Sequence, residues 1–313
     1  MASKQEQMLD CIIVGGGPAG LTAAIYLARY HRKFALFDGN SGRLAMIPRS
    51  HNFPGYPDGV AGCDLLADMR KQAEKYGADL RDLWVDAAEA CTDDDGGGFL
   101  VRAGQEKLRA RTVLLATGVV NLRPDMDDEV HDKALHAGLL RYCPICDAYE
   151  ETDNKIAVIG SSDHGVAEAL FLRQYSEDIT VLALYSSDLD AKDRANLKEA
   201  GIGWEKSPIA KIDFFKTKAK VTLEDGNVLD FDTIYPALGS ETRNELGKAL
   251  GVELCDDVCF LTDAHQRTNV AGVYAAGDAC EGLDQISVAM GHGAVAATTI
   301  HNDLRDWDGH TAD

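Results

Sequence analysis

The stretch that most constrains the fold is the glycine-rich sequence Gly15-Gly16-Gly17-Pro18-Ala19-Gly20. It follows an apolar segment, residues 11–14, that is typical of a buried parallel strand, and it precedes a helical segment, residues 21–30. In such a GxGxxG loop, Gly15 permits the tight turn, Gly17 lets the backbone approach a pyrophosphate, and Gly20 allows close helix packing. A second strand, residues 34–37, leads into Asp38, which is placed to accept hydrogen bonds from a ribose hydroxyl. The pattern predicts a dinucleotide-binding site.

The same layout returns later in the chain. A strand at 155–159 leads into Gly160-Ser161-Ser162-Asp163-His164-Gly165, a helix at 166–175 and a further strand at 179–184. From residue 246 the chain returns to the first layout, with a strand at 272–276 that reaches Gly277-Asp278 and a helix at 285–300. We therefore predict an α/β fold of two Rossmann-like (three-layer ββα) domains, the second inserted in the first. The first comprises residues 1–120 and 245–313, and the second residues 121–244.

Weaker patterns fill the remaining chain. We expect an irregular segment at 40–58, an amphipathic helix at 64–76, and a hairpin of 84–91 with 99–103. A strand at 112–116 stops at Thr117-Gly118, an alternating stretch covers 211–231, and a strand at 234–238 stops at Gly239.

Between the two glycine loops lies Cys143-Pro144-Ile145-Cys146, followed by Asp147. Apolar residues at helical spacing over 135–149 place this motif at a helix, whose N-terminus would favour a thiolate. Asp147 would then move protons as the sulfurs open and close a disulfide. A structural disulfide and half of a zinc site are the alternatives. No second CxxC or histidine pair stands at zinc spacing, so we expect a redox role and no metal.

Composition narrows the class of protein. The chain has 51 acidic and 31 basic residues, a net charge of −20, which disfavours nucleic acid and anionic membrane as partners. No apolar run reaches membrane-spanning length. Residues 1–8 are polar and no cleavage site follows, which argues against a signal peptide and favours a reducing, cytoplasmic location.

Taken in order, these motifs resemble the low-molecular-weight thioredoxin reductase family of FAD-dependent disulfide oxidoreductases. The likeness covers nearly the whole chain and includes Asn52-Phe53-Pro54-Gly55, Ala116-Thr117-Gly118 and Gln285-Ile286. It implies a homodimer that holds FAD in the first domain and acts on a thioredoxin-like protein or a small dithiol or disulfide. The cofactor-binding residues would be Gly15, Gly17, Pro18, Ala19, Gly20, Asp38, Asn52, Ala116, Thr117, Gly118, Gly277, Asp278, Gln285 and Ile286.

The resemblance also implies roles within the Cys143-Cys146 pair. Cys146 would face the flavin and take its electrons, Cys143 would attack the substrate disulfide, and Asp147 would act as acid and base. Gly277 and Asp278 would lie near the ribityl and phosphate groups, and Gln285 and Ile286 beside the isoalloxazine.

The sequence departs from the family at the second glycine loop. Ser162 replaces the middle glycine, so a side chain stands where a pyrophosphate would approach. Asp38 follows Gly15 by 23 residues, and the same offset from Gly160 reaches Ala183, followed by Leu184, Tyr185, Ser186 and Ser187. Neither an acidic residue for NAD nor an arginine cluster for NADP is there. We therefore expect an enzyme that does not use NADPH efficiently, with ferredoxin as donor or a second flavin in the vacated site.

Several readings stay open. The chain is alternatively a dithiol oxidase that passes electrons from a small dithiol through FAD to oxygen, or a non-catalytic flavin redox sensor. Basic stretches at 29–33 and 206–220 are either ferredoxin-docking patches or ordinary solvated surface. Ser41-Gly42-Arg43-Leu44 stands where the family tends to carry Gly-Gly-Gln-Leu near the flavin. Cys255 and Cys259 are either a secondary redox pair or two ordinary thiols.

Overall fold

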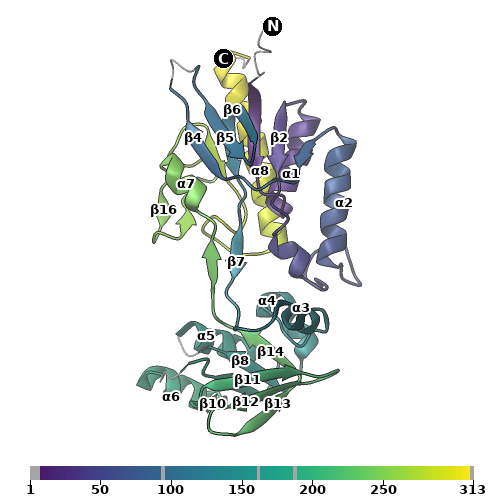
Figure 1. Ribbon diagram of the computed structural model, residues 1–313, viewed down its shortest axis with the longest axis vertical. Coiled ribbons are helices and arrows are strands. Elements are labelled where there is room, and N and C mark those ends of the chain that lie inside the picture. Colours follow the sequence, from purple (N-terminus) through teal and green to yellow (C-terminus); the bar gives the residue numbers. More distant parts are fainter. Residues whose placement is uncertain (1–7, 93–95, 161–162, 186–188, 311–313) are drawn as a thin grey trace. The chain divides into compact units, whose positions relative to one another are not determined.

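The computed structural model describes residues 8–92, 96–160, 163–185 and 189–310 (Figure 1). The chain forms two compact units. The first contains Met1–Met46, Gly62–Val120 and Glu241–Asp313, and the second contains Ile47–Ala61 and Asn121–Ser240. The α/β class, with two Rossmann-like units and the second inserted in the first, is confirmed. The segment Ile47–Ala61, which we expected in the first domain, belongs to the second unit.

The first unit is built on a seven-stranded sheet in which β18 lies beside β6 and the other strands follow the order β3-β2-β1-β6-β5-β4. Strands β1, β2, β3, β6 and β18 are parallel, whereas β4, β5 and the first half of β6 form an antiparallel meander. The bounds are β1 (Leu9–Val14), β2 (Phe34–Phe37), β3 (Asp79–Arg81), β4 (Ala87–Ala90), β5 (Phe99–Ala103), β6 (Glu106–Leu115) and β18 (Val273–Ala275).

Helices α1 (Pro18–Arg29) and α8 (Ile286–Trp307) pack closely in this unit. A Cβ at Gly293 would lie 2.2 Å from the carbonyl oxygen of Ala19, so only glycine permits this approach. The remaining elements are η1 (Arg43–Met46), α2 (Gly62–Lys75), α7 (Glu245–Leu250) and a small hairpin of β16 (Leu254–Cys255) and β17 (Cys259–Phe260).

The second unit repeats the parallel arrangement on a smaller scale. Its four parallel strands follow the order β10-β9-β8-β14, and a separate antiparallel sheet follows the order β11-β12-β13. The strands are β8 (Ile156–Ile159), β9 (Ile179–Leu182), β10 (Gly203–Glu205), β11 (Ile209–Phe214), β12 (Ala219–Leu223), β13 (Val228–Phe231) and β14 (Thr233–Pro236). The helices are α3 (Asp128–His136), α4 (Pro144–Asp147), η3 (Ala148–Glu151), α5 (Asp163–Leu172) and α6 (Ala191–Glu199). The connecting strands β7 (Val119–Asn121) and β15 (Ser240–Thr242) pair with each other.

The prediction of a helix across residues 135–149 is wrong. Helix α3 ends at His136, Gly138 adopts a left-handed φ of 71°, and the chain then runs without helix as far as Cys143. Leu140 forms a parallel bridge with Ile234 and is fully buried. The apolar residues therefore serve packing against a sheet, and Pro144 begins a separate single turn, since proline is tolerated in the first turn of a helix.

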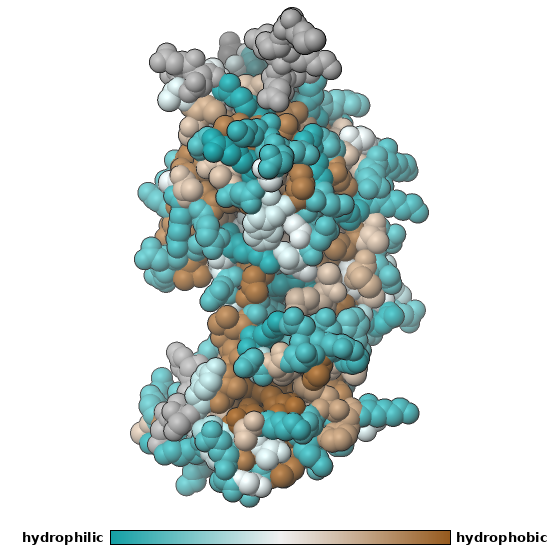
Figure 2. Space-filling model, viewed as in Figure 1, coloured by the Kyte–Doolittle hydropathy of each residue, from teal (hydrophilic) through white to brown (hydrophobic). Residues whose placement is uncertain are grey.

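Hydrophilic side chains cover most of the face shown in Figure 2, as the net charge of −20 leads one to expect. Among the residues that the structure describes, no helix combines the length and apolar character needed to cross a bilayer.

Candidate active site

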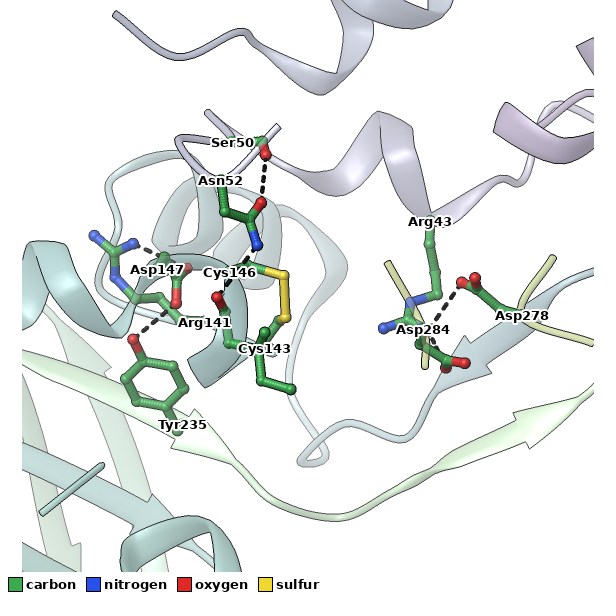
Figure 3. Close-up of a disulfide and its surroundings, with 11 residues drawn as sticks. Arg43, Ser50, Asn52, Arg141, Cys143, Cys146, Asp147, Tyr235, Asp278 and Asp284 are labelled. Atoms are coloured by element: carbon green, nitrogen blue, oxygen red, sulfur yellow. Dashed lines mark hydrogen bonds and ion pairs between the residues drawn. A yellow bond between two sulfur atoms is a disulfide. The ribbon is translucent and has the colours of Figure 1, made fainter. Parts of the chain in front are cut away.

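Cys143 and Cys146 form a disulfide, with Cα atoms 5.2 Å apart (Figure 3). Cys143 is the residue before α4, Cys146 lies within its single turn, and the amide of Cys146 donates to the carbonyl of Cys143 at 2.9 Å. Both cysteines are partly exposed, and Ile145 between them is 49% exposed. A reactant can reach the sulfurs, whereas a single helical turn contributes little of the macrodipole that we expected to act on them.

Two side chains hold Asp147, the residue after the motif. The Tyr235 hydroxyl donates to its Oδ1 at 2.8 Å, and the Arg141 guanidinium donates to its Oδ2 at 3.0 Å (Figure 3). Tyr235 lies in β14 and is fully buried, whereas Arg141 lies just before the motif. Both carboxylate oxygens are thereby oriented by elements on either side of α4.

Burial has the largest effect on the pKa of Asp147. Desolvation raises its pKa above the usual range, while the charge of Arg141 and the hydrogen bonds from Tyr235 and Arg141 act in the opposite direction. The pKa of Tyr235 is raised by burial and by the charge of Asp147. Asp147 is therefore an acid whose proton is held more tightly than in water and whose position is fixed.

Two more carboxyl groups belong to this region. Glu151 is buried and accepts from Arg141 at 2.6 Å, so this guanidinium bridges two acids. Glu168, on α5, has its pKa raised to about 7 by burial and then by the charge of Asp147. Its Oε1 is buried and has no hydrogen-bond partner in the described part of the chain.

Asn52 belongs to the second unit. Its side-chain amide donates to the carbonyl of Ile145 at 3.2 Å and its Oδ1 accepts from the Ser50 hydroxyl at 3.0 Å (Figure 3). The structure therefore brings Asn52 to the cysteine motif. Its expected contact with the cofactor stays a prediction.

In the first unit, three predicted segments meet at the carboxyl edge of the parallel sheet. Val14 lies opposite Leu115, and Leu115 lies opposite Ala275. The residues that follow these three strand ends are therefore neighbours. Gly15 to Gly20 follow β1, and Pro18 and Ala19 begin α1. Ala116, Thr117 and Gly118 follow β6, and Gly277 and Asp278 come after β18. This edge is where open α/β sheets bind nucleotides.

The glycines of the first loop have distinct spatial roles. A Cβ at Gly15 would lie 2.1 Å from the Ala116 carbonyl oxygen, and one at Gly20 would lie 1.9 Å from the Gly15 carbonyl oxygen. At Gly17, in contrast, no atom of the described chain lies within 4 Å of where a Cβ would stand. Gly15 and Gly20 serve packing, whereas Gly17 leaves an open approach to the N-terminus of α1, as the pyrophosphate of FAD requires.

Asp38 directly follows β2 and is 6% exposed. It accepts from Arg70 at 2.7 Å and from the Asn40 amide at 2.9 Å. A Cβ at Gly16 would lie 2.1 Å from its carboxylate, so Gly16 is also required, although the motif treats this position as variable. Asp38 thus stands as an oriented acceptor beside the loop.

Asp278 lies beside Arg43, the residue that departs from the family pattern. The Arg43 guanidinium donates to Asp278 at 3.2 Å and to Asp284 at 2.8 Å (Figure 3). Burial, and then the charge of Asp284, raise the pKa of Asp278 to about 6, while Arg43 opposes the shift. Gln285 is the N-cap of α8, and Ile286 is its first residue.

The second unit keeps the backbone layout of the first at its packing glycines. Gly160 donates to the Leu182 carbonyl as Gly15 donates to that of Phe37. A Cβ at Gly160 would lie 2.8 Å from the Ala237 carbonyl oxygen, and one at Gly165 would lie 2.6 Å from that of Gly160.

Ala183 occupies the place of Asp38. It directly follows β9 as Asp38 follows β2, and it is fully buried. Leu184 is half-buried and Tyr185 is 73% exposed. Ser162, Ser186 and Ser187, on which the prediction also rests, lie outside the described residues.

Sequence reasoning missed Arg141, Tyr235 and Arg70, which orient carboxyl groups, and the further acids Glu151 and Glu168. Only Arg141 carried a local signal, as a charge two residues before Cys143. Within the described ranges, no group of three or more histidine, cysteine, aspartate or glutamate side chains is arranged to hold a metal ion.

Comparisons with known proteins agree with this geometry. Residues 9–293 match the family model described as pyridine nucleotide-disulphide oxidoreductase. A thioredoxin reductase of Mycolicibacterium smegmatis is 31% identical over 318 residues, covering 98% of this chain and 100% of that protein.

Solved structures show the same likeness. Thioredoxin reductase from Streptococcus pyogenes has a TM-score of 0.84 at 27% identity, covering 96% of this chain and 99% of the other. The atypical thioredoxin reductase TRi from Desulfovibrio vulgaris Hildenborough is 30% identical with a TM-score of 0.52, covering 95% and 98%. The chain therefore belongs to the pyridine nucleotide-disulphide oxidoreductase family, among its low-molecular-weight, thioredoxin-reductase-like and FAD-dependent members.

Proposed function

We propose that this enzyme exchanges electrons between FAD and an external disulfide through Cys143 and Cys146, with a thioredoxin-like protein or a small disulfide as acceptor. The observation that carries the proposal is a partly exposed disulfide directly beside a half-buried, oriented carboxyl group, Asp147. FAD, when bound in the first unit, supplies two-electron chemistry.

The residues of the second unit account for the sulfur and proton chemistry. The Cys143-Cys146 disulfide becomes a dithiol by taking up two electrons and two protons. In its protonated form Asp147 supplies a proton to a departing sulfur, and as a carboxylate it removes one from the attacking thiol. Cys143 then attacks the external disulfide, and Cys146 displaces the reduced product from the mixed disulfide while the internal disulfide forms again.

We further propose that NADPH is not the direct donor, and that ferredoxin or a second flavin takes its place. Ala183 supports this proposal, because it stands where Asp38 stands in the first unit and offers neither a carboxylate nor a guanidinium. The packing glycines Gly160 and Gly165 are retained, so the difference concerns recognition and not the fold. An atypical thioredoxin reductase among the similar structures is consistent with a departure from the usual donor.

An anaerobic titration tests the donor. The purified FAD-loaded protein is titrated with NADPH and then NADH while flavin absorbance is followed. We expect no bleaching by either nucleotide and full bleaching by dithionite or dithiothreitol. Rapid bleaching by NADPH at low concentration would refute the donor proposal and leave the disulfide chemistry intact.

A Cys146→Ser variant is the matched control for the sulfur pathway. Dithionite should still bleach its flavin, whereas dithiothreitol should not, because the dithiol has lost its route through the disulfide. Equal bleaching of the variant and the wild type by dithiothreitol would contradict the role of the pair. Peroxide measured during aerobic dithiol turnover separates this reductase from the dithiol oxidase alternative, which the reductase relatives do not favour.

Two further expectations belong to this proposal. The resemblance implies a homodimer, and a cytoplasmic location stays a prediction. Light scattering of the FAD-loaded protein measures the first, and fractionation of cells that express it measures the second.

A further inference from the structure

A second pair of cysteines faces each other across the hairpin of β16 and β17. Cys255 lies directly opposite Cys259, and the turn between them consists of Asp256, Asp257 and Val258. Opposed residues of an antiparallel pair point to the same face, with Cα atoms about 4.5–5.5 Å apart. A disulfide needs a Cα separation of about 4.4–6.8 Å, so the typical spacing of such an opposed pair lies within the range that a disulfide can span.

The two thiols differ in their surroundings. Burial, and then the charges of Glu281 and Asp256, raise the pKa of Cys255. The Cys259 sulfur lies 3.8 Å from the Thr242 hydroxyl. Both cysteines are partly exposed. Cys255 therefore holds its proton more tightly than a free thiol, whereas the neighbour of Cys259 is a neutral hydroxyl. We assign the first attack to Cys259 for this reason.

The other thiols of the described chain lack this arrangement. Cys11 and Cys280 are buried, and burial raises the pKa of each to about 12. Cys63 is exposed on α2 and Cys91 follows β4, and neither is opposite another cysteine in the strand pairings of the described residues. Among the free thiols of the described residues, only Cys255 and Cys259 combine access with an opposed cysteine.

We propose that Cys255 and Cys259 form a second, reversible redox pair that reacts with low-molecular-weight disulfides. The Cys259 thiolate attacks one sulfur of the small disulfide, a mixed disulfide forms, and the first small thiol leaves. Cys255 gives its proton to the solvent and attacks the Cys259 sulfur, which breaks the mixed disulfide and releases the second small thiol. The two cysteines lose two electrons and two protons, and the small disulfide gains both. A small dithiol reverses the reaction.

The inference does not depend on the proposed catalytic function, and peptide mapping tests it on the full FAD-loaded protein. The protein is reduced, freed of reductant, treated with hydroxyethyl disulfide without oxygen, quenched with N-ethylmaleimide and digested. We expect Cys255 and Cys259 to be recovered linked to each other, with loss of maleimide labelling at both, and to regain the label after dithiothreitol.

Cys63 is the matched control, since an exposed thiol with no cysteine opposite it should carry a hydroxyethylthio adduct or the maleimide. In a Cys259→Ser variant the link should disappear, and in a Cys280→Ser variant it should persist. The link should also form in a Cys143→Ser/Cys146→Ser double variant, because it does not pass through the active-site pair.

Separate adducts on Cys255 and Cys259 in the wild type would overturn the proposal. A link between Cys259 and Cys280 would do so as well, because it would assign the partner to the buried thiol.

Discussion

The hydrogen bond from Tyr235 to Asp147 offers the sharpest test of the acid–base assignment. A Tyr235→Phe substitution removes one hydroxyl from a fully buried side chain and keeps the ring. The bond to Oδ1 is 2.8 Å long, and the Arg141 contact to Oδ2 remains in the variant. The hydroxyl stabilises the carboxylate, so its loss raises the pKa of Asp147.

The size of the effect follows from the kind of bond. A hydrogen bond to a charged group contributes about 1.5–3 kcal/mol, and about 1.4 kcal/mol corresponds to one pKa unit. The pKa of Asp147 should therefore rise by about 1–2 units in Tyr235→Phe. Replacing Arg141 would give a larger shift, but it would also leave Glu151 buried without its cation.

The assay is a single-turnover reaction of the reduced enzyme with a small disulfide, followed across pH in the wild type and in two variants. In the plot of rate against pH, the transition that is due to Asp147 is the one that disappears in Asp147→Asn. We expect that transition to move to higher pH by about 1–2 units in Tyr235→Phe. An infrared difference band of the protonated carboxyl group should move in parallel. A transition that stays in place, or that moves to lower pH, would refute the reasoning.

Three further outcomes are expected. Burial raises the pKa of Glu168 from 4.5 to about 7, so its folded state binds more protons and loses stability as pH rises between these values. Urea unfolding at pH 5 and pH 8 should show a loss of about 2.5 kcal/mol that is absent in Glu168→Gln. Gly17→Ala should keep the unfolding midpoint of the apoprotein while FAD affinity, measured by fluorescence, falls about tenfold or more, whereas Gly20→Ala should prevent folding. Arg43→Gln should raise the pKa of Asp278 above about 6, which shifts the pH dependence of FAD binding upward.

The sequence predicts best where neighbours in the chain decide the structure. The strand β1, the glycine loop and helix α1 follow from apolar periodicity and loop chemistry within about twenty residues. The second copy of this layout follows from the first. The helix expected over 135–149 failed because Leu140 is buried by pairing with Ile234, a partner that lies far along the chain. Leu140 is buried, as its apolar side chain predicts, but it packs against a sheet and not along one face of a helix.

In the candidate site, too, the residues that are close in the sequence were predicted and their distant partners were not. Cys143, Cys146 and Asp147 carry their chemistry in one short motif. Tyr235 is separated from Asp147 by 88 residues and lies in an apolar strand, where a tyrosine suggests ordinary core. Only the folded chain shows that its hydroxyl reaches a carboxylate.

The retained glycines of the second unit have a consequence for protein engineering. Gly160 and Gly165 still provide the close backbone approaches that the scaffold needs, and those are the hardest features to install by substitution. Under the donor proposal, this unit needs an acidic or basic side chain at the end of β9, where Ala183 stands, before it can recognise a pyridine nucleotide. We expect substitutions at positions 162 and 183–187 to supply that recognition with no redesign of the sheet. A variant substituted at these positions would accept electrons from a different donor while its backbone stays unchanged.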